Sequence, residues 1–125
     1  MPVNHKINKE IKTIFVRADG NVEIEELLDD ERKILKNPEF EKGYNKYVDF
    51  SGAIPGPNAS FDKIIIAADF IQSTQDIRGK SKWSIYAPDQ DAYAFSILFA
   101  RLARDSGVET KVFMNEYQAK KWIGV

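Results

Sequence analysis

The chain has 125 residues, a mass of 14.3 kDa and a formal net charge of -1, values that fit one compact domain over 1–125. The 18 Lys and Arg residues nearly balance 19 Asp and Glu residues, which argues against nucleic-acid binding, because a duplex binder needs a basic surplus. The absence of cysteine excludes disulfides, thiolate metal sites and cysteine nucleophiles, and a single histidine excludes a multi-histidine metal centre. No apolar run approaches the roughly 20 residues that span a bilayer, and the first residues lack a signal-peptide core, so we expect a cytoplasmic protein.

The first third of the chain predicts two strands and a helix. The strands are expected at 3–8 and 12–18, with a turn at Lys9-Glu10 between them and a chain reversal at Asp19-Gly20-Asn21. A helical stripe of apolar residues follows over 24–36. Acidic residues crowd its first turns and basic residues its last, which suits the helix dipole.

The middle of the chain predicts a strand, a loop and a second helix. The strand is expected at 44–50, and the loop at 51–58 contains two glycines and two prolines. Ser60 can cap a helix over 61–77. The triple Ile64-Ile65-Ile66 would equally suit a buried strand, but the length of the segment and its cap favour helix.

The last third alternates strand and helix twice. Strands are expected at 82–87 and 110–114, and helices from Pro88-Asp89 to 105 and over 116–123. Asn115 is expected to cap the last helix. The resulting order, β-β-α-β-α-β-α-β-α, predicts an α/β fold. We expect a largely parallel sheet whose first strand runs antiparallel at one edge.

No complete catalytic motif is present. Gly79-Lys80-Ser81 resembles the tail of a phosphate-binding loop, but the first glycine of that motif is missing and a strand follows where a helix should, so a solvated turn is favoured. Asp49 ends a predicted strand without the partners of a phosphoacceptor, so we expect it to order a loop. Asp89 is explained as a helix cap, and no proton partner for His5 can be named. We therefore expect neither an enzyme, nor a metal site, nor a cofactor.

Aromatic residues fall mostly on predicted inward faces, where core packing explains them. A helix rich in phenylalanine can nevertheless line a cavity as well as fill one. The residues that would line such an apolar-ligand pocket are Phe61, Ile65, Phe95 and Phe99.

Several segments, spread in order along nearly the whole chain, together resemble the SpoIIAA-like domains related to STAS, the sulfate-transporter and anti-sigma-factor-antagonist module. The matching segments are Phe15-Val16-Arg17-Ala18-Asp19-Gly20 before an acidic helix, Asn37-Pro38-Glu39-Phe40 with Gly43 and Tyr44, Val48-Asp49-Phe50-Ser51-Gly52, Trp83-Ser84-Ile85-Tyr86-Ala87-Pro88 with Asp91-Ala92-Tyr93, and Val112-Phe113 before Glu116, Ala119, Trp122 and Ile123. The resemblance implies a STAS-like mixed, mostly parallel sheet of four or five strands, with helices packed mainly on one side. It also implies a regulatory or binding role in place of catalysis.

Three functions follow from the resemblance and the residues. The leading expectation is a non-enzymatic STAS-like module that binds a protein partner or a small ligand, and a homodimer is compatible with the exposed face of such a sheet. The second is a carrier of an apolar ligand or lipid, since related folds occur in CRAL-TRIO lipid-exchange domains. The third is a phospho-switched antagonist of an anti-sigma factor, with Ser60 as the candidate phosphoacceptor and Ser51 as the other, although the Asp-Ser-Ser-Gly sequence of the antagonists is absent.

Overall fold

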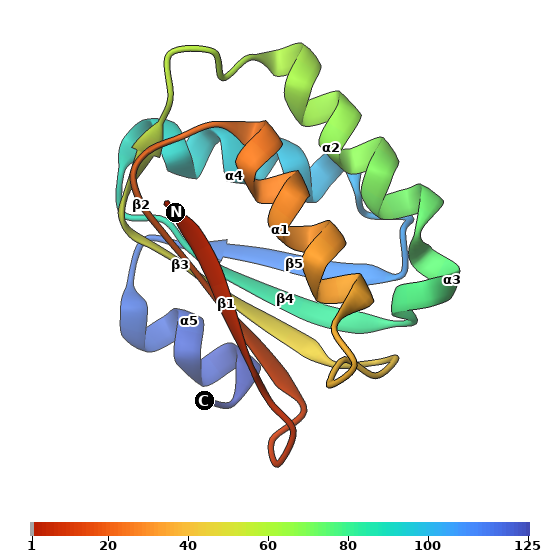
Figure 1. The fold of residues 1–125 in the computed structure, drawn as a ribbon. Helices are drawn as coiled ribbons and strands as arrows, with labels where there is room; N and C mark the ends of the chain where they lie inside the picture. The colour runs from red at the N-terminus through yellow and green to blue at the C-terminus, as the bar shows by residue number, and fades with distance from the viewer. Residues whose placement is uncertain (1) are drawn as a thin grey trace.

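A single five-stranded sheet organises the computed structural model, which describes residues 2–125 (Figure 1). Its strands are β1 (Val3–Asn8), β2 (Thr13–Val22), β3 (Asn45–Pro55), β4 (Ser81–Tyr86) and β5 (Val108–Phe113), which lie side by side in that order. β1 pairs antiparallel with β2, and every other neighbouring pair is parallel. The predicted α/β class, the element order and the antiparallel first strand are confirmed.

Helices cover both faces of this sheet, unequally. They are α1 (Ile24–Lys36), α2 (Phe61–Ser73), the short α3 (Gln75–Arg78), α4 (Gln90–Leu102) and α5 (Glu116–Ile123). α1, α2 and α4 lie over one face, and α5 lies over the other (Figure 1). The Ser84 hydroxyl donates to the carbonyl oxygen of Ala119 at 2.7 Å and so ties β4 to α5.

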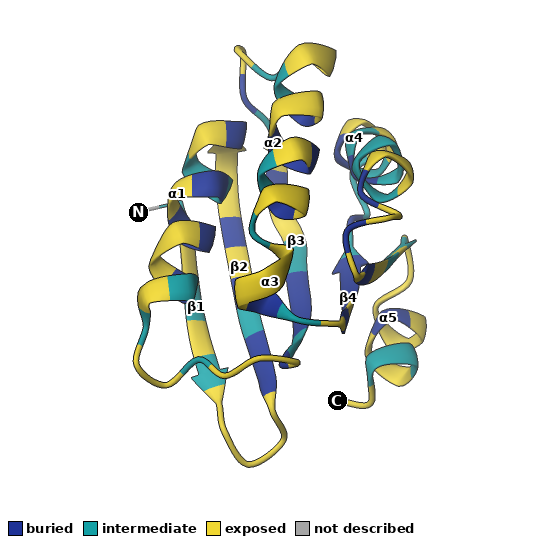
Figure 2. Ribbon diagram, turned by 90° about the vertical axis from the view of Figure 1, so that its right-hand side faces the viewer, coloured by how far each residue is buried: buried dark blue, intermediate teal, exposed yellow. Residues whose placement is uncertain are grey.

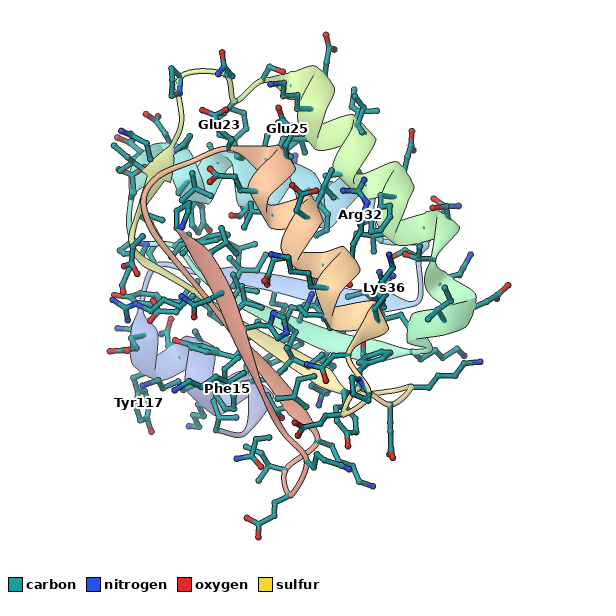
Figure 3. All side chains as sticks on the ribbon, in the orientation of Figure 1. Phe15, Glu23, Glu25, Arg32, Lys36 and Tyr117 are labelled. Atoms are coloured by element: carbon teal, nitrogen blue, oxygen red, sulfur yellow. The ribbon has the colours of Figure 1, made fainter. Side chains whose placement is uncertain are left out.

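The helix starts follow the local chemistry of their first residues. The side chains of Ser60, Asp89 and Asn115 each accept a hydrogen bond from a backbone N–H three residues on, as predicted for caps. In α1, Glu23 and Glu25 stand at the start of the helix and Arg32 and Lys36 toward its end (Figure 3). That order of charge complements the helix dipole.

Two expectations about the β2–β3 region are wrong. The chain does not reverse at Asp19-Gly20-Asn21, because β2 continues to Val22, and the expected loop over 51–58 is still strand as far as Pro55. Each segment is a weak strand former alone, but the two pair with each other, Gly20 opposite Ala53 and Val22 opposite Pro55. Pairing across the sheet therefore overrides the local turn signals.

The expected helix over 61–77 is interrupted at Thr74, which separates α2 from α3. The Thr74 hydroxyl donates to the carbonyl oxygen of Phe70 at 2.8 Å, a local bond that competes with helix continuation. The other element ends lie within three residues of those expected.

Burial follows the layers. Buried residues gather in β4 and in the first halves of β2 and β3, whereas the helices alternate buried with exposed residues (Figure 2). Within residues 2–125, no helix is long and apolar enough to cross a membrane.

Candidate functional site

A cavity of about 150 Å³ lies between the sheet and the three helices α1, α2 and α4. Its wall is almost entirely apolar and includes Val48 on the sheet, Leu28 on α1, Ile64 on α2 and Phe95 on α4. These side chains converge because parallel strands and their crossover helices turn their apolar faces toward the same layer. The cavity therefore belongs to the main core of the fold and not to a surface loop.

The cavity has a deep end and an open end along β3. Lys46, Val48 and Phe50 alternate along the strand, so all three point to the cavity side. Lys46 is 4% exposed and pairs in register with Trp83, which also lines the cavity. Ile54, near the other end of β3, lines the cavity and is 49% exposed, so it marks the opening.

Three charged side chains form the buried ion cluster at the deep end: Glu31 from α1, Lys46 from β3 and Arg78 from α3. One oxygen of the Glu31 carboxylate accepts from the Lys46 ammonium, and the other accepts from Arg78 Nε at 3.0 Å. All three residues are buried, with Arg78 only 2% exposed. Buried charges are stable only when paired, so the cluster holds α1, β3 and α3 in one arrangement.

The Arg78 guanidinium also donates to two groups at the end of α2, one on the backbone and one on the side chain of the C-cap residue. It donates to the carbonyl oxygen of Ile71 at 2.8 Å and to the Thr74 hydroxyl at 2.7 Å. Arg78 is thus satisfied by protein groups, and its role in the cluster is structural.

The Lys46 ammonium is placed differently. Its Nζ lies 3.7 Å from the centroid of the Trp83 ring, a cation–π contact, and Lys46 lines the cavity. Burial lowers the pKa of Lys46, while the Glu31 carboxylate opposes that shift. Lys46 therefore belongs to the deep end of the cavity wall, where its ammonium packs on Trp83, another lining residue.

A second polar contact flanks the cluster. Asp30, the neighbour of Glu31 on α1, is bonded through one carboxylate oxygen to His5 Nδ1 at 2.9 Å. This contact ties β1 to α1 and supplies the partner for His5 that could not be named from the sequence.

Of the four residues expected to line an apolar pocket, Phe95 and Phe99 lie in the cavity wall, but Phe61 and Ile65 do not. Phe61 is 62% exposed at the first position of α2, and Ile65 is 39% exposed. The buried stripe of α2 instead runs through Ile64, Ala67, Ala68 and Ile71. One residue along a helix is about a quarter turn around it, so Ile65 turns away where Ile64 turns in.

Asp49 lies on the opposite face of the sheet from the cavity. Its carboxylate accepts from the backbone N–H of Ser51 at 2.8 Å and from Arg17 at 3.2 Å. Phe15 and Tyr117 also belong to this side of the sheet, which carries α5 (Figure 3). Burial is the main cause that raises the pKa of Tyr47, whose buried hydroxyl also belongs to this face.

The two candidate phosphoacceptors have different settings. Ser60 is half-buried, and its hydroxyl accepts from the backbone N–H of Lys63 at 3.3 Å. Ser51 is exposed within β3. Neither serine lines the cavity, although Ala59, the neighbour of Ser60, does.

The remaining motif residues occupy structural positions. Gly79 and Lys80 connect α3 to β4, which begins at Ser81. A strand therefore follows this turn, where a phosphate-binding loop is followed by a helix. Asp89 caps α4 through the backbone N–H of Ala92 at 3.0 Å. Residues 2–125 contain no group of three or more His, Cys, Asp or Glu side chains that could hold a metal ion.

Sequence reasoning missed all three members of the buried ion cluster. Two of them carried a signal: Glu31 interrupts the apolar stripe of α1 between Leu28 and Ile34, and Lys46 alternates with inward-facing Val48 on β3. Arg78 carried none, since it stands among other basic residues near a turn and looks like a solvated side chain.

Comparison with known proteins leaves this geometry as the main guide to function. A scan against models of known protein families found no match, and no curated protein matches the chain.

Proposed function

We propose that this protein is a non-catalytic binding module of the STAS-related, SpoIIAA-like kind, and that its cavity holds a small apolar ligand. The cavity beneath α1, α2 and α4 is the observation that carries the proposal. The family part of the proposal is based on the ordered residue segments described above, from Phe15 to Ile123.

The size and chemistry of the cavity favour a small apolar occupant. An engineered cavity of similar volume, lined by Leu, Ile and Phe, binds benzene and excludes water. A wall of apolar atoms offers water few hydrogen-bond partners. One ring or a short acyl chain fits this space, whereas drug-sized ligands need roughly 300–1,000 Å³.

The proposal is tested by filling the cavity from its wall. Ala67 on α2 lines the cavity, whereas its equally buried neighbour Ala68 does not. We expect toluene and 1-hexanol to raise the Tm of the wild-type protein and of Ala68→Leu, because both probes bind only the folded state. In Ala67→Leu the new side chain occupies the cavity, so the same probes should leave Tm unchanged.

The result is read from calorimetric scans with and without each probe, relative to the Tm of each variant alone. A wild-type protein whose Tm responds to neither probe overturns the proposal. An Ala67→Leu variant that responds as strongly as the wild type places the binding elsewhere and overturns it equally.

A further inference from the structure

The Lys46 ammonium retains unused hydrogen-bonding capacity. An ammonium has three N–H donors. The Glu31 carboxylate is its one hydrogen-bond acceptor within residues 2–125, and the Trp83 ring covers another side of Nζ. Because Lys46 lines the cavity, an acceptor atom on a ligand can complete its coordination.

Hydrogen-bond acceptors are scarce in the buried ion cluster. Two cations, Lys46 and Arg78, face a single carboxylate, and both oxygens of that carboxylate are already in use. Asp30 is a second buried carboxylate in the cavity wall, bonded to His5 through one oxygen. Hydrogen bonds to charged groups are strong in a dry interior, so the favoured ligand atom beside Lys46 is a charged acceptor that bonds its ammonium directly.

The cavity also imposes a direction on a ligand. Lys46 and Trp83 form its deep end, and Ile54 marks its opening. The wall between those ends is apolar, with Val48 on the sheet side and Phe95 on the helix side. A ligand that matches this space has a charged head placed inward and an apolar chain directed outward.

We propose that the ligand is a small apolar monocarboxylate, with its carboxylate bound to the Lys46 ammonium and its chain pointing toward Ile54. This inference rests on the proposed function, because it names the ligand class of the same cavity. A phosphate dianion suits the site less well. Phosphate sites in proteins supply several backbone N–H or guanidinium donors, whereas this site, within residues 2–125, offers only the unused donors of one ammonium. A cationic ligand would be repelled by the Lys46 ammonium at the deep end.

The test compares three probes of equal chain length: hexanoate, 1-hexanol and hexylammonium. Their dissociation constants are measured by calorimetric titration with the wild-type protein, with Lys46→Met and with Lys82→Met. Lys82 is the matched control, because its ammonium also lies over a tryptophan, Trp122, but at 5.4 Å on the opposite face of the sheet. Lys46→Met keeps Glu31 paired with Arg78 and leaves the apolar wall in place.

We expect the wild type and Lys82→Met to bind hexanoate about 10- to 100-fold more tightly than 1-hexanol, the range of one buried charge-assisted hydrogen bond. Lys46→Met should lose that preference and still bind 1-hexanol. Hexylammonium should bind most weakly to the wild type.

A wild type that binds 1-hexanol as tightly as hexanoate overturns the carboxylate inference and leaves the proposed function standing. An unchanged preference in Lys46→Met also overturns the inference. Failure of every probe to bind overturns the proposed function itself.

A measurement on the wild type keeps the inference falsifiable if Lys46→Met does not fold. Nuclear Overhauser contacts should join the C2 protons of bound hexanoate to the Trp83 ring and its terminal methyl group to Ile54. The reversed orientation would refute the inference.

Discussion

The buried ion cluster predicts an unequal response to the loss of its members. Within residues 2–125, Glu31 is the one carboxylate bonded to Lys46 and Arg78, and it accepts from both. In Glu31→Gln, two buried cations lose their counter-ion while the shape of the side chain is kept. Breaking a buried ion pair in this way costs about 3–5 kcal/mol, a large part of the roughly 5–15 kcal/mol that stabilises a typical domain.

Lys46→Met should cost far less, no more than about 1–2 kcal/mol. The remaining Glu31 and Arg78 form a balanced pair, with the second guanidinium contact at 2.9 Å. The methionine thioether can pack on the Trp83 ring that the ammonium covered. Burying the ammonium costs free energy, which is why burial lowers the pKa of Lys46, and Lys46→Met removes that cost.

The free energy of unfolding of both variants is measured by urea denaturation at pH 7. Equal m-values, the slopes of that free energy with urea concentration, confirm that only stability changes. Glu25→Gln is the control, because Glu25 pairs with Lys63 on the surface and its loss should change the midpoint little. The loss of unfolding free energy in Glu31→Gln should also become smaller as pH rises, because the unneutralised Lys46 can then give up its proton. A Lys46 whose pKa is lowered in the folded state binds its proton less tightly than in the unfolded chain, so stability increases with pH.

Two outcomes refute this reasoning. A Glu31→Gln variant as stable as Glu25→Gln would mean that the cluster carries no unbalanced charge. A Lys46→Met variant as unstable as Glu31→Gln would mean that the ammonium, and not the carboxylate, is the indispensable member.

Two further predictions concern the surface of the fold. Ser60→Ala removes the cap of α2 and should cost about 0.5–2 kcal/mol in urea unfolding, whereas exposed Ser51→Ala should stay within roughly 0.5 kcal/mol; equal effects would contradict the capping role. A hydrogen bond from Lys63 lowers the pKa of Glu25, so the folded state binds that proton less tightly than the unfolded chain, and the stabilisation is present at neutral pH and lost as pH falls through the lowered pKa. The small advantage of the wild type over Glu25→Gln should therefore vanish in acid, and an advantage that persists at low pH would contradict this origin.

The fold was predictable wherever a local signal agreed with the tertiary structure. Helix 24–36 was placed at its observed bounds, because its apolar stripe and its charge order both mark the same segment. The caps Ser60, Asp89 and Asn115 were predicted for the same reason. The β2–β3 ends were not, because Gly20 and Pro55 become strand residues only by pairing with the neighbouring strand, at Ala53 and Val22.

The candidate site was predictable in part. Phe95 and Phe99, expected as pocket residues from the stripe of α4, lie in the cavity wall, whereas Phe61 and Ile65, expected from α2, lie outside it. The periodicity of α2 is ambiguous, since three consecutive isoleucines satisfy a helical stripe at more than one rotation. The rotation was decided by packing against α1 and α4.

By itself, the sequence determined the α/β class, the order of the elements and the exclusion of thiol and multi-histidine chemistry, because these depend on composition and on local periodicity. Only the tertiary structure decided that the core contains a cavity and that its deep end is charged. Lys46 lies 15 residues and Arg78 lies 47 residues beyond Glu31 along the chain, and each of the three is an ordinary surface type when read alone. They become a site because crossover connections bring one helix, one strand and one short helix to the same buried point, where a charge must find its partner.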